Sequence, residues 1–215
     1  MNALLLTNYY LVYRSLFMYA GIAFLASALI LHFGDASLQP LAAMLAILFL
    51  VMPALEVIKH EGKSGYDKFV LTLPVTRKKV ISSHYMFYLL VVLMGTLLSI
   101  SVFYLYGFIT SNPIEHIISI VSTGTFIVIT AGAISYPLLF TFGSEKSDAI
   151  TIGGAGGALL SMFGLESLVA TLVQNNILPF ELSPSNLMVM YVAAGCIFYV
   201  LSFFISVWIY NKKEF

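Results

Sequence analysis

The sequence predicts an all-α, polytopic membrane protein with six transmembrane helices. Its 215 residues are 60% hydrophobic and 9% charged, whereas soluble domains are about one-quarter charged. Six apolar runs follow one another, each near the roughly 20 residues that a helix needs to cross a bilayer core of about 30 Å. All 10 Lys and Arg residues fall on one side of the membrane when these runs are taken as spans. We therefore expect one transmembrane domain over residues 1–215.

The apolar runs are continuous and do not alternate between polar and apolar residues. Strands of a membrane-spanning barrel alternate in this way, so the pattern argues against a β-barrel and favours helices. The predicted spans cover residues 16–33, 41–58, 85–110, 117–142, 149–173 and 187–210.

Both ends of the chain are predicted to lie in the cytosol, since six crossings leave them on the same side. The segments on that side contain every cation: Arg14, Lys59, Lys63, Lys68, Arg77, Lys78, Lys79, Lys146, Lys212 and Lys213. The opposite connections contain Asp35, Glu115 and Glu181 but no Lys or Arg. An excess of Lys and Arg marks the cytosolic side of most membrane proteins.

Residues 1–15 are predicted to form an amphipathic helix that lies in the membrane interface before the first span. Apolar and polar residues are interleaved there, and Tyr9, Tyr10 and Tyr13 suit the depth of the lipid headgroups. The alternative is that these residues simply extend the first span.

Residues 59–84 form the largest hydrophilic segment, on the cytosolic side. Their apolar residues follow the i, i+3, i+4, i+7 spacing of a helix with one apolar face: Tyr66, Phe69, Val70 and Leu73. Asp67 lies off this stripe, and Pro74 ends the helix. Thr76 is a good N-cap for a second helix that begins at Arg77 and enters the third span. We expect a rigid helix–break–helix projection.

Two features within the spans are open to more than one interpretation. Gly153, Gly154, Gly156 and Gly157 open the fifth span and serve either close packing within the chain or a dimer contact or hinge. Pro137 frees one backbone carbonyl of the fourth span and is expected to kink it.

Ionisable groups are scarce in the spans, which argues against ion-coupled transport and against a membrane-embedded enzyme. Glu56 is close enough to the cytosolic end to reach water. Glu166, near the outer end of the fifth span, either reaches the outer surface or forms a polar element of an external gate. The last outer connection, residues 174–186, contains Pro179 and Pro184 and is apolar enough to dip back toward the membrane.

No catalytic, metal or cofactor site is expected. Gly62-Lys63-Ser64 lacks the preceding glycine of a phosphate-binding loop, because Val57 occupies that position. His60-Glu61 lacks the second histidine of a zinc helix. The histidines stand apart, and His84, at a span end, is expected to reach water. The formal net charge of zero suggests no nucleic-acid partner.

Two short motifs carry a family resemblance. The segment Leu73-Pro74-Val75-Thr76-Arg77 resembles the Leu-Pro-[Val/Met]-[Ser/Thr]-Arg stretch after the second span of type-2 ABC transporter permeases. Tyr136-Pro137-Leu138, followed by Phe142-Gly143-Ser144-Glu145-Lys146, resembles the element that ends their fourth span. In architecture the whole chain is similar to the small permease subunits of bacterial exporters of peptides and antimicrobials, including the phenol-soluble modulin exporter.

The resemblance implies a permease subunit of an ATP-driven exporter in the bacterial cell membrane, with ATP hydrolysis in a separate subunit. Residues 65–73 would be the coupling helix, residues 1–15 a connecting helix beside the ATPase, and residues 143–146 a smaller second contact. The implied ATPase-docking residues are Tyr66, Asp67, Phe69, Val70, Leu73, Pro74, Thr76, Arg77, Glu145 and Lys146. A second permease, identical or different, would complete the pathway for amphipathic peptides or other lipid-soluble substrates, and Glu166 would lie near the external gate.

Two other classes of function compete with the exporter. An immunity or sensor protein could sequester a membrane-active peptide without transport and would need no ATPase. A membrane enzyme acting on lipids would need paired carboxylates or a metal-binding cluster, which the sequence does not offer.

Overall fold

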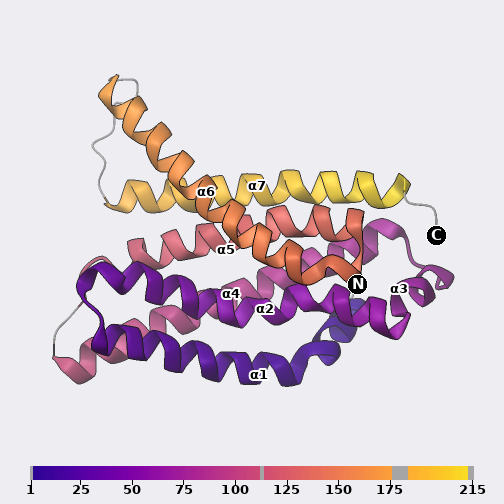
Figure 1. The fold of residues 1–215 in the computed structure, drawn as a ribbon, viewed down its shortest axis with the longest axis horizontal. Helices are drawn as coiled ribbons and strands as arrows, with labels where there is room; N and C mark the ends of the chain where they lie inside the picture. Colours follow the sequence, from indigo (N-terminus) through magenta and orange to yellow (C-terminus); the bar gives the residue numbers. More distant parts are fainter. Residues whose placement is uncertain (1, 112–113, 176–183, 213–215) are drawn as a thin grey trace.

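The computed structural model describes residues 2–111, 114–175 and 184–212, and no β-strand occurs among them. Figure 1 shows the arrangement of the helices. In chain order the elements are α1 (Asn2–Phe33), η1 (Ala36–Leu38), α2 (Gln39–Ser64), α3 (Tyr66–Phe69), η2 (Val70–Thr72), α4 (Arg77–Thr110), α5 (Ile117–Phe142), η3 (Ser144–Lys146), α6 (Ser147–Gln174) and α7 (Pro184–Lys212), where η denotes a 3₁₀ helix.

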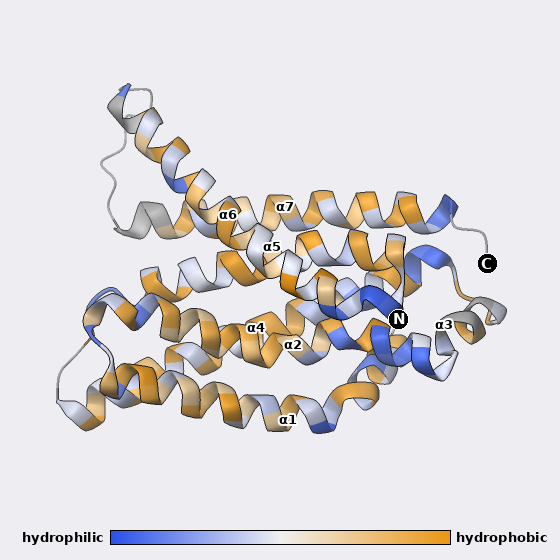
Figure 2. Cartoon of the chain, viewed as in Figure 1, coloured by the Kyte–Doolittle hydropathy of each residue, from blue (hydrophilic) through white to orange (hydrophobic). Residues whose placement is uncertain are grey.

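Six of these helices, α1, α2, α4, α5, α6 and α7, are long and apolar enough to cross a membrane, which confirms the predicted fold class. The fourth span coincides with α5, Ile117–Phe142. Others run past the predicted span ends: α2 continues to Ser64, and α4 begins at Arg77. Hydropathy locates the part of a helix that suits lipid, whereas backbone hydrogen bonding continues into polar residues until a helix breaker is met. Figure 2 shows this change from apolar to hydrophilic residues toward the end where α3 lies.

The N-terminal residues belong to α1, which is one continuous helix from Asn2 to Phe33. Figure 1 shows that its first turns run at an angle to the rest of the helix. Leu4, Asn8 and Val12, spaced by four residues, are buried along one side. The segment predicted as an interfacial helix is therefore packed against the protein on one face.

α5 lies at the centre of the bundle and α6 at its edge. Among the 18 consecutive residues that make up the most apolar stretch of each helix, 72% are buried in α5 and 11% in α6. α5 packs against α2, α6 and α7, while α1 packs chiefly against α2. Figure 1 shows α6 leaving the bundle toward its C-terminal end.

The glycines at the start of α6 divide into two pairs. A Cβ built on Gly154 would lie 2.1 Å from the hydroxyl of Ser135, and one on Gly157 would lie 3.0 Å from the side chain of Ile134. Gly153 and Gly156 have no such neighbour within 4 Å among the described residues. Close packing within the chain thus accounts for Gly154 and Gly157 alone.

Candidate functional site

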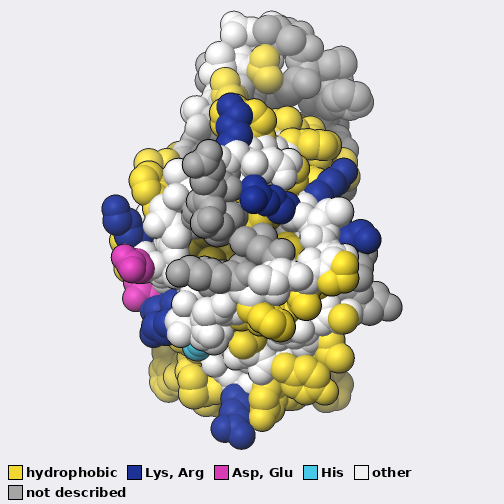
Figure 3. Space-filling view, turned by 90° about the vertical axis from the view of Figure 1, so that its right-hand side faces the viewer, with side chains coloured by type: hydrophobic (Ala, Val, Ile, Leu, Met, Phe, Trp, Pro, Cys, Tyr) yellow, Lys and Arg dark blue, Asp and Glu magenta, His cyan; other side chains and the backbone are white. Residues whose placement is uncertain are grey.

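The Lys and Arg side chains that the structure describes gather at the end of the bundle where α3 lies, here called the basic end. Figure 3 looks at this end and shows Lys and Arg side chains spread across it. The α2–α4 connection (residues 65–76) and the α5–α6 connection at η3 both lie here. The candidate site is therefore built from two loops that the sequence keeps about 70 residues apart.

The α2–α4 connection is a compact, mostly helical segment. Gly65 ends α2 in the left-handed conformation (φ 73°), and its N–H donates to the carbonyls of Glu61 and Gly62. One turn of α-helix, Tyr66–Phe69, tightens into the 3₁₀ helix Val70–Thr72. Leu73 is extended before Pro74, as the residue before a proline prefers.

The second helix begins where the sequence predicted. Thr76 is the N-cap residue of α4, with extended backbone, and Arg77 is the first helical residue. The Thr76 hydroxyl makes no capping hydrogen bond, so its backbone carbonyl, which accepts from the N–H groups of Lys79 and Val80, starts the helix.

The predicted apolar stripe of this segment is divided between the interior and the surface. Val70 is 1% exposed and clusters with Leu4 of α1 and Val80 of α4, with Tyr66 and Leu73 packed against them. Phe69 is 56% exposed. Asp67 belongs to α3, and its side chain lies outside the described set. Most of the stripe therefore holds the segment on the bundle, and Phe69 is its one large exposed apolar side chain that the structure describes.

The second predicted contact, η3, packs directly against the end of α2. A Cβ on Gly62 would lie 2.1 Å from the hydroxyl oxygen of Ser144, so the close approach depends on glycine at position 62. Lys59 forms an ion pair with Asp148, which joins α2 to the start of α6. Glu145 and Lys146 are exposed beside this junction, as are Pro74 and Thr76 in the other loop.

A buried acid–base pair, which sequence reasoning missed, lies at the base of the α2–α4 connection. Glu61 Oε2 and His84 Nε2 are 3.3 Å apart, and their side chains are 8% and 2% exposed. The expectation that His84 reaches water is wrong, because Leu139 and Phe140 of α5 and Tyr210 of α7 close around the pair. A small cavity of about 60 Å³ adjoins it. The sequence feature that could have indicated this pair is the position of Glu61 and His84 near the two ends of the hydrophilic segment 59–84.

Arg77 points from the start of α4 to the end of α7. Its Nη1 donates hydrogen bonds to the backbone carbonyls of Tyr210 and Asn211, each at 3.1 Å. The last carbonyls of a helix have no partner within the helix and carry its negative partial charge, so a guanidinium is well suited to bind them.

Tyrosine and serine hydroxyls continue the contact between α4 and α7 into the bundle. The Tyr85 hydroxyl lies 2.7 Å from the hydroxyls of both Ser202 and Ser206. The Tyr199 hydroxyl donates to the backbone carbonyl of Tyr85 at 2.8 Å. Buried polar groups in an apolar bundle need such partners, and here the partners come from the neighbouring helix.

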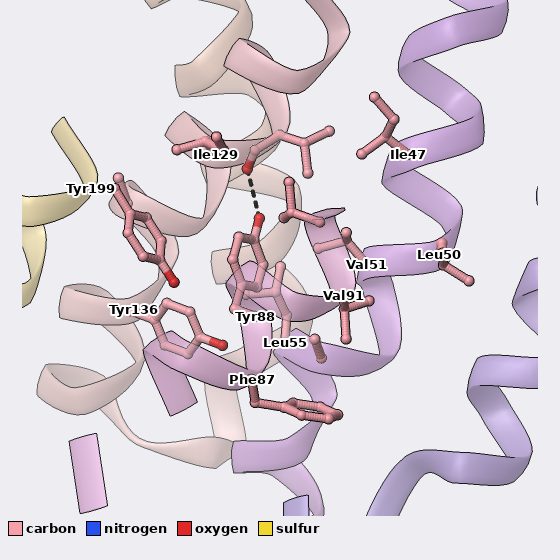
Figure 4. Close-up of a cluster of buried hydrophobic side chains, with 14 of the residues drawn as sticks. Ile47, Leu50, Val51, Leu55, Phe87, Tyr88, Val91, Ile129, Tyr136 and Tyr199 are labelled. Atoms are coloured by element: carbon pink, nitrogen blue, oxygen red, sulfur yellow. Dashed lines mark hydrogen bonds between the residues drawn. The ribbon is translucent and has the colours of Figure 1, made fainter. Parts of the chain in front are cut away.

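Two further tyrosines bind α4 to α5. The Tyr88 hydroxyl donates to the carbonyl of Val128 at 2.6 Å, the bond drawn in Figure 4 among the buried side chains of the core. The Tyr136 hydroxyl donates to the carbonyl of His84 at 3.3 Å. Gly132 leaves the space that the Tyr88 ring fills, since a Cβ there would lie 2.4 Å from it. A fully buried aromatic core thus includes its own hydrogen bonds.

Glu166 lies on α6, far from the basic end, and is exposed. The Tyr191 hydroxyl of α7 donates to Glu166 Oε1 at 3.4 Å, a long bond that links the diverging ends of α6 and α7. Most of the predicted outer segment 174–186 lies outside the described residues. No group of three or more His, Cys, Asp or Glu side chains that could hold a metal ion occurs in the described part of the chain.

Comparison with protein families shows which family the chain belongs to. The model of the ABC-2 family transporter protein matches residues 3–211. The chain belongs to the ABC-2 transporter family. Comparisons with curated proteins and with solved structures found no match. The family resemblance inferred from the two motifs is confirmed at this level.

As an ABC-2 family member, the protein is a multi-pass membrane permease subunit of an ABC transporter. Permeases of this family are generally non-catalytic and belong to a transport system with an ATPase partner. Both motifs of the resemblance lie at or next to the basic end, in the α2–α4 connection and at the junction of α5 with η3.

Proposed function

We propose that this ABC-2 permease is the membrane subunit of an ATP-driven bacterial exporter of amphipathic or hydrophobic substrates such as membrane-active peptides. One observation carries the proposal: the compact segment 65–76 is joined directly to α2 and α4 and presents an exposed aromatic side chain, Phe69, at the basic end. A force that a soluble partner applies to this segment acts on two spans at once, α2 and α4.

The basic end faces the cytosol in this proposal, because Lys and Arg accumulate on the cytosolic side of membrane proteins. The ATPase docks there around Phe69, since exposed aromatic side chains surrounded by polar residues are typical anchors of protein interfaces. Pro74, Thr76, Glu145 and Lys146 form the rim of this docking surface, and the buried Val70 supports it from below.

The scarcity of ionisable side chains at membrane depth supports ATP as the energy source and lipid-soluble molecules as substrates. Coupling to an ion gradient normally requires such groups in the spans. A second permease, identical or different, completes the pathway. Glu166 and Tyr191 form part of its external gate.

The experiment replaces Phe69 by Ala in the permease copurified with its ATPase and reconstituted in liposomes. Substrate-stimulated ATP hydrolysis should fall by at least about tenfold, because hot-spot aromatic residues each contribute about 2 kcal/mol or more to a protein interface. The matched control is Phe33→Ala at the opposite end of α1, where the side chain is 80% exposed.

Equal stimulation in the Phe69→Ala variant and in the control would remove the docking assignment. A peptide-sequestering protein without transport would purify with no ATPase after mild detergent extraction, and that result would reject the exporter as a whole.

A further inference from the structure

The contact between α4 and α7 forms a continuous seam in the half of the bundle nearest the basic end. Arg77 binds the carbonyls of Tyr210 and Asn211, and Tyr85, eight residues later, meets Ser202 and Ser206. The two helices are antiparallel: Tyr85 lies eight residues after Arg77 on α4, and its partners on α7 lie four to nine residues before those of Arg77. At 1.5 Å per residue the seam extends about 12 Å along α4.

The seam also reaches α5. The Ser202 hydroxyl donates to the carbonyl of Ala133 at 2.6 Å, and the Tyr85 ring lies 4.7 Å from the ring of Tyr136, centroid to centroid. α7 is thus fixed to α4 at its end and to both α4 and α5 farther in.

Arg77 is the outermost contact of the seam and the one nearest to the α2–α4 connection. It follows Thr76 directly, so any displacement of the connection reaches Arg77 before the rest of α4. The two hydrogen bonds to Tyr210 and Asn211 are charge-assisted and are made to main-chain atoms, so they hold the helix itself rather than a mobile side chain.

We infer that Arg77 is a positioning residue that fixes the basic end of α7 to the α2–α4 connection, so that the sixth span moves together with α4 when the ATPase displaces the connection. This inference rests on the proposed function. It adds α7 to the spans that the connection moves directly, α2 and α4.

The test combines Arg77→Cys with Asn211→Cys in a Cys196→Ser background, since Cys196 is the chain's single cysteine and is exposed. The permease is purified with its ATPase, reconstituted, and assayed for ATP-dependent transport of a fluorescently labelled amphipathic α-helical peptide. Without cross-linker, transport should fall at least about tenfold, because Arg77→Cys removes both charge-assisted hydrogen bonds to the end of α7. A short bis-maleimide that joins the two thiols should restore it to within about twofold of the Cys196→Ser parent.

Three results would overturn the inference: normal transport without the cross-linker, no recovery with it, or loss of the ATPase from the purified complex. The last would mean that Arg77 contacts the ATPase itself. Lys78→Ala, which removes the neighbouring exposed cation, is the control for charge and should transport normally.

A second measurement does not depend on transport. Amide hydrogen exchange in the last turn of α7 should quicken about tenfold in Arg77→Ala, less in Arg77→Lys, and not in Lys78→Ala, with the other helices unchanged. Unchanged exchange would reject the contact as a clamp. Failure of the exporter proposal alone appears differently, as absence of ATP-dependent transport in the parent while the exchange effect persists.

Discussion

Glu61 and His84 close the base of the α2–α4 connection with a contact of 3.3 Å between Oε2 and Nε2. One residue is in the last turn of α2 and the other in the third turn of α4, so the pair holds the two helices together where the chain leaves and re-enters the bundle. Both side chains are almost fully buried. The contact turns the segment between them into a loop with a fixed base.

The pair should stabilise the permease measurably. Replacing Glu61 by Ala leaves the imidazole of His84 buried without this partner, which should lower the free energy of unfolding by about 1–3 kcal/mol. A double-mutant cycle with His84→Ala, followed by unfolding in detergent, measures the coupling energy. The control is His32→Ala, which removes an exposed imidazole in the last turn of α1. A coupling energy near zero would mean that the two groups are neighbours without a stabilising interaction.

The break in the hydrogen-bond ladder of α5 gives a second prediction. Pro137 lacks the N–H that would bind the carbonyl of Ala133, and the Ser202 hydroxyl binds that carbonyl instead. Ser202→Ala should therefore destabilise the protein by about 1–2 kcal/mol.

The rescue for this prediction is Pro137→Ala, which returns the N–H to α5. The double variant Pro137→Ala/Ser202→Ala should lose less stability than the sum of the two single variants. Ser101→Ala, which removes an exposed hydroxyl that bonds within its own helix, should change little. Strict additivity of the first two substitutions would show that Ser202 does not compensate for the proline.

Pro137 and Ser202 also show which structural features can be predicted from the sequence and which cannot. The freed carbonyl follows from the position of Pro137 alone, since the missing bond is always four residues back. The donor that binds it is 69 residues away, on another helix, and depends on how α7 packs against α5. The same division explains the six spans, which depend on local hydropathy, and the burial of His84, which depends on neighbours from α5 and α7.

The connecting segment shows a similar limit. Spacing alone placed Tyr66, Phe69, Val70 and Leu73 on one helical face, and the structure keeps the helical conformation through Thr72. Periodicity does not say which partner covers an apolar face. Here Leu4 of α1, more than 60 residues earlier in the chain, covers Val70 and leaves Phe69 at the surface. Burial and exposure within one stripe are a tertiary property.

Replacing Val70 by Ala should therefore lower the stability of the protein more than replacing Phe69 by Ala. Val70→Ala removes buried methyl groups from the Leu4–Val70–Val80 cluster and should cost about 2 kcal/mol of stability. Phe69→Ala should change stability by less than about 0.5 kcal/mol, because the side chain lies largely in solvent. Thermal unfolding in detergent and limited proteolysis of the connection measure both. A larger loss of stability in Phe69→Ala than in Val70→Ala would contradict the burial described above.

The basic end should face the cytosol, because the proposed docking of the ATPase at Phe69 requires this orientation. In a Cys196→Ser background, a cysteine is placed at Lys63, exposed at the end of α2, or at Glu115, exposed in the connection between α4 and α5. A membrane-impermeant maleimide applied to intact cells should label the Glu115→Cys variant. It should label the Lys63→Cys variant only after the membrane is permeabilised, because the Lys- and Arg-rich side is expected to face the cytosol. The parent without cysteine controls for background labelling. Equal labelling of Lys63→Cys in intact and permeabilised cells would place Phe69 outside the cell, where no ATPase can reach it.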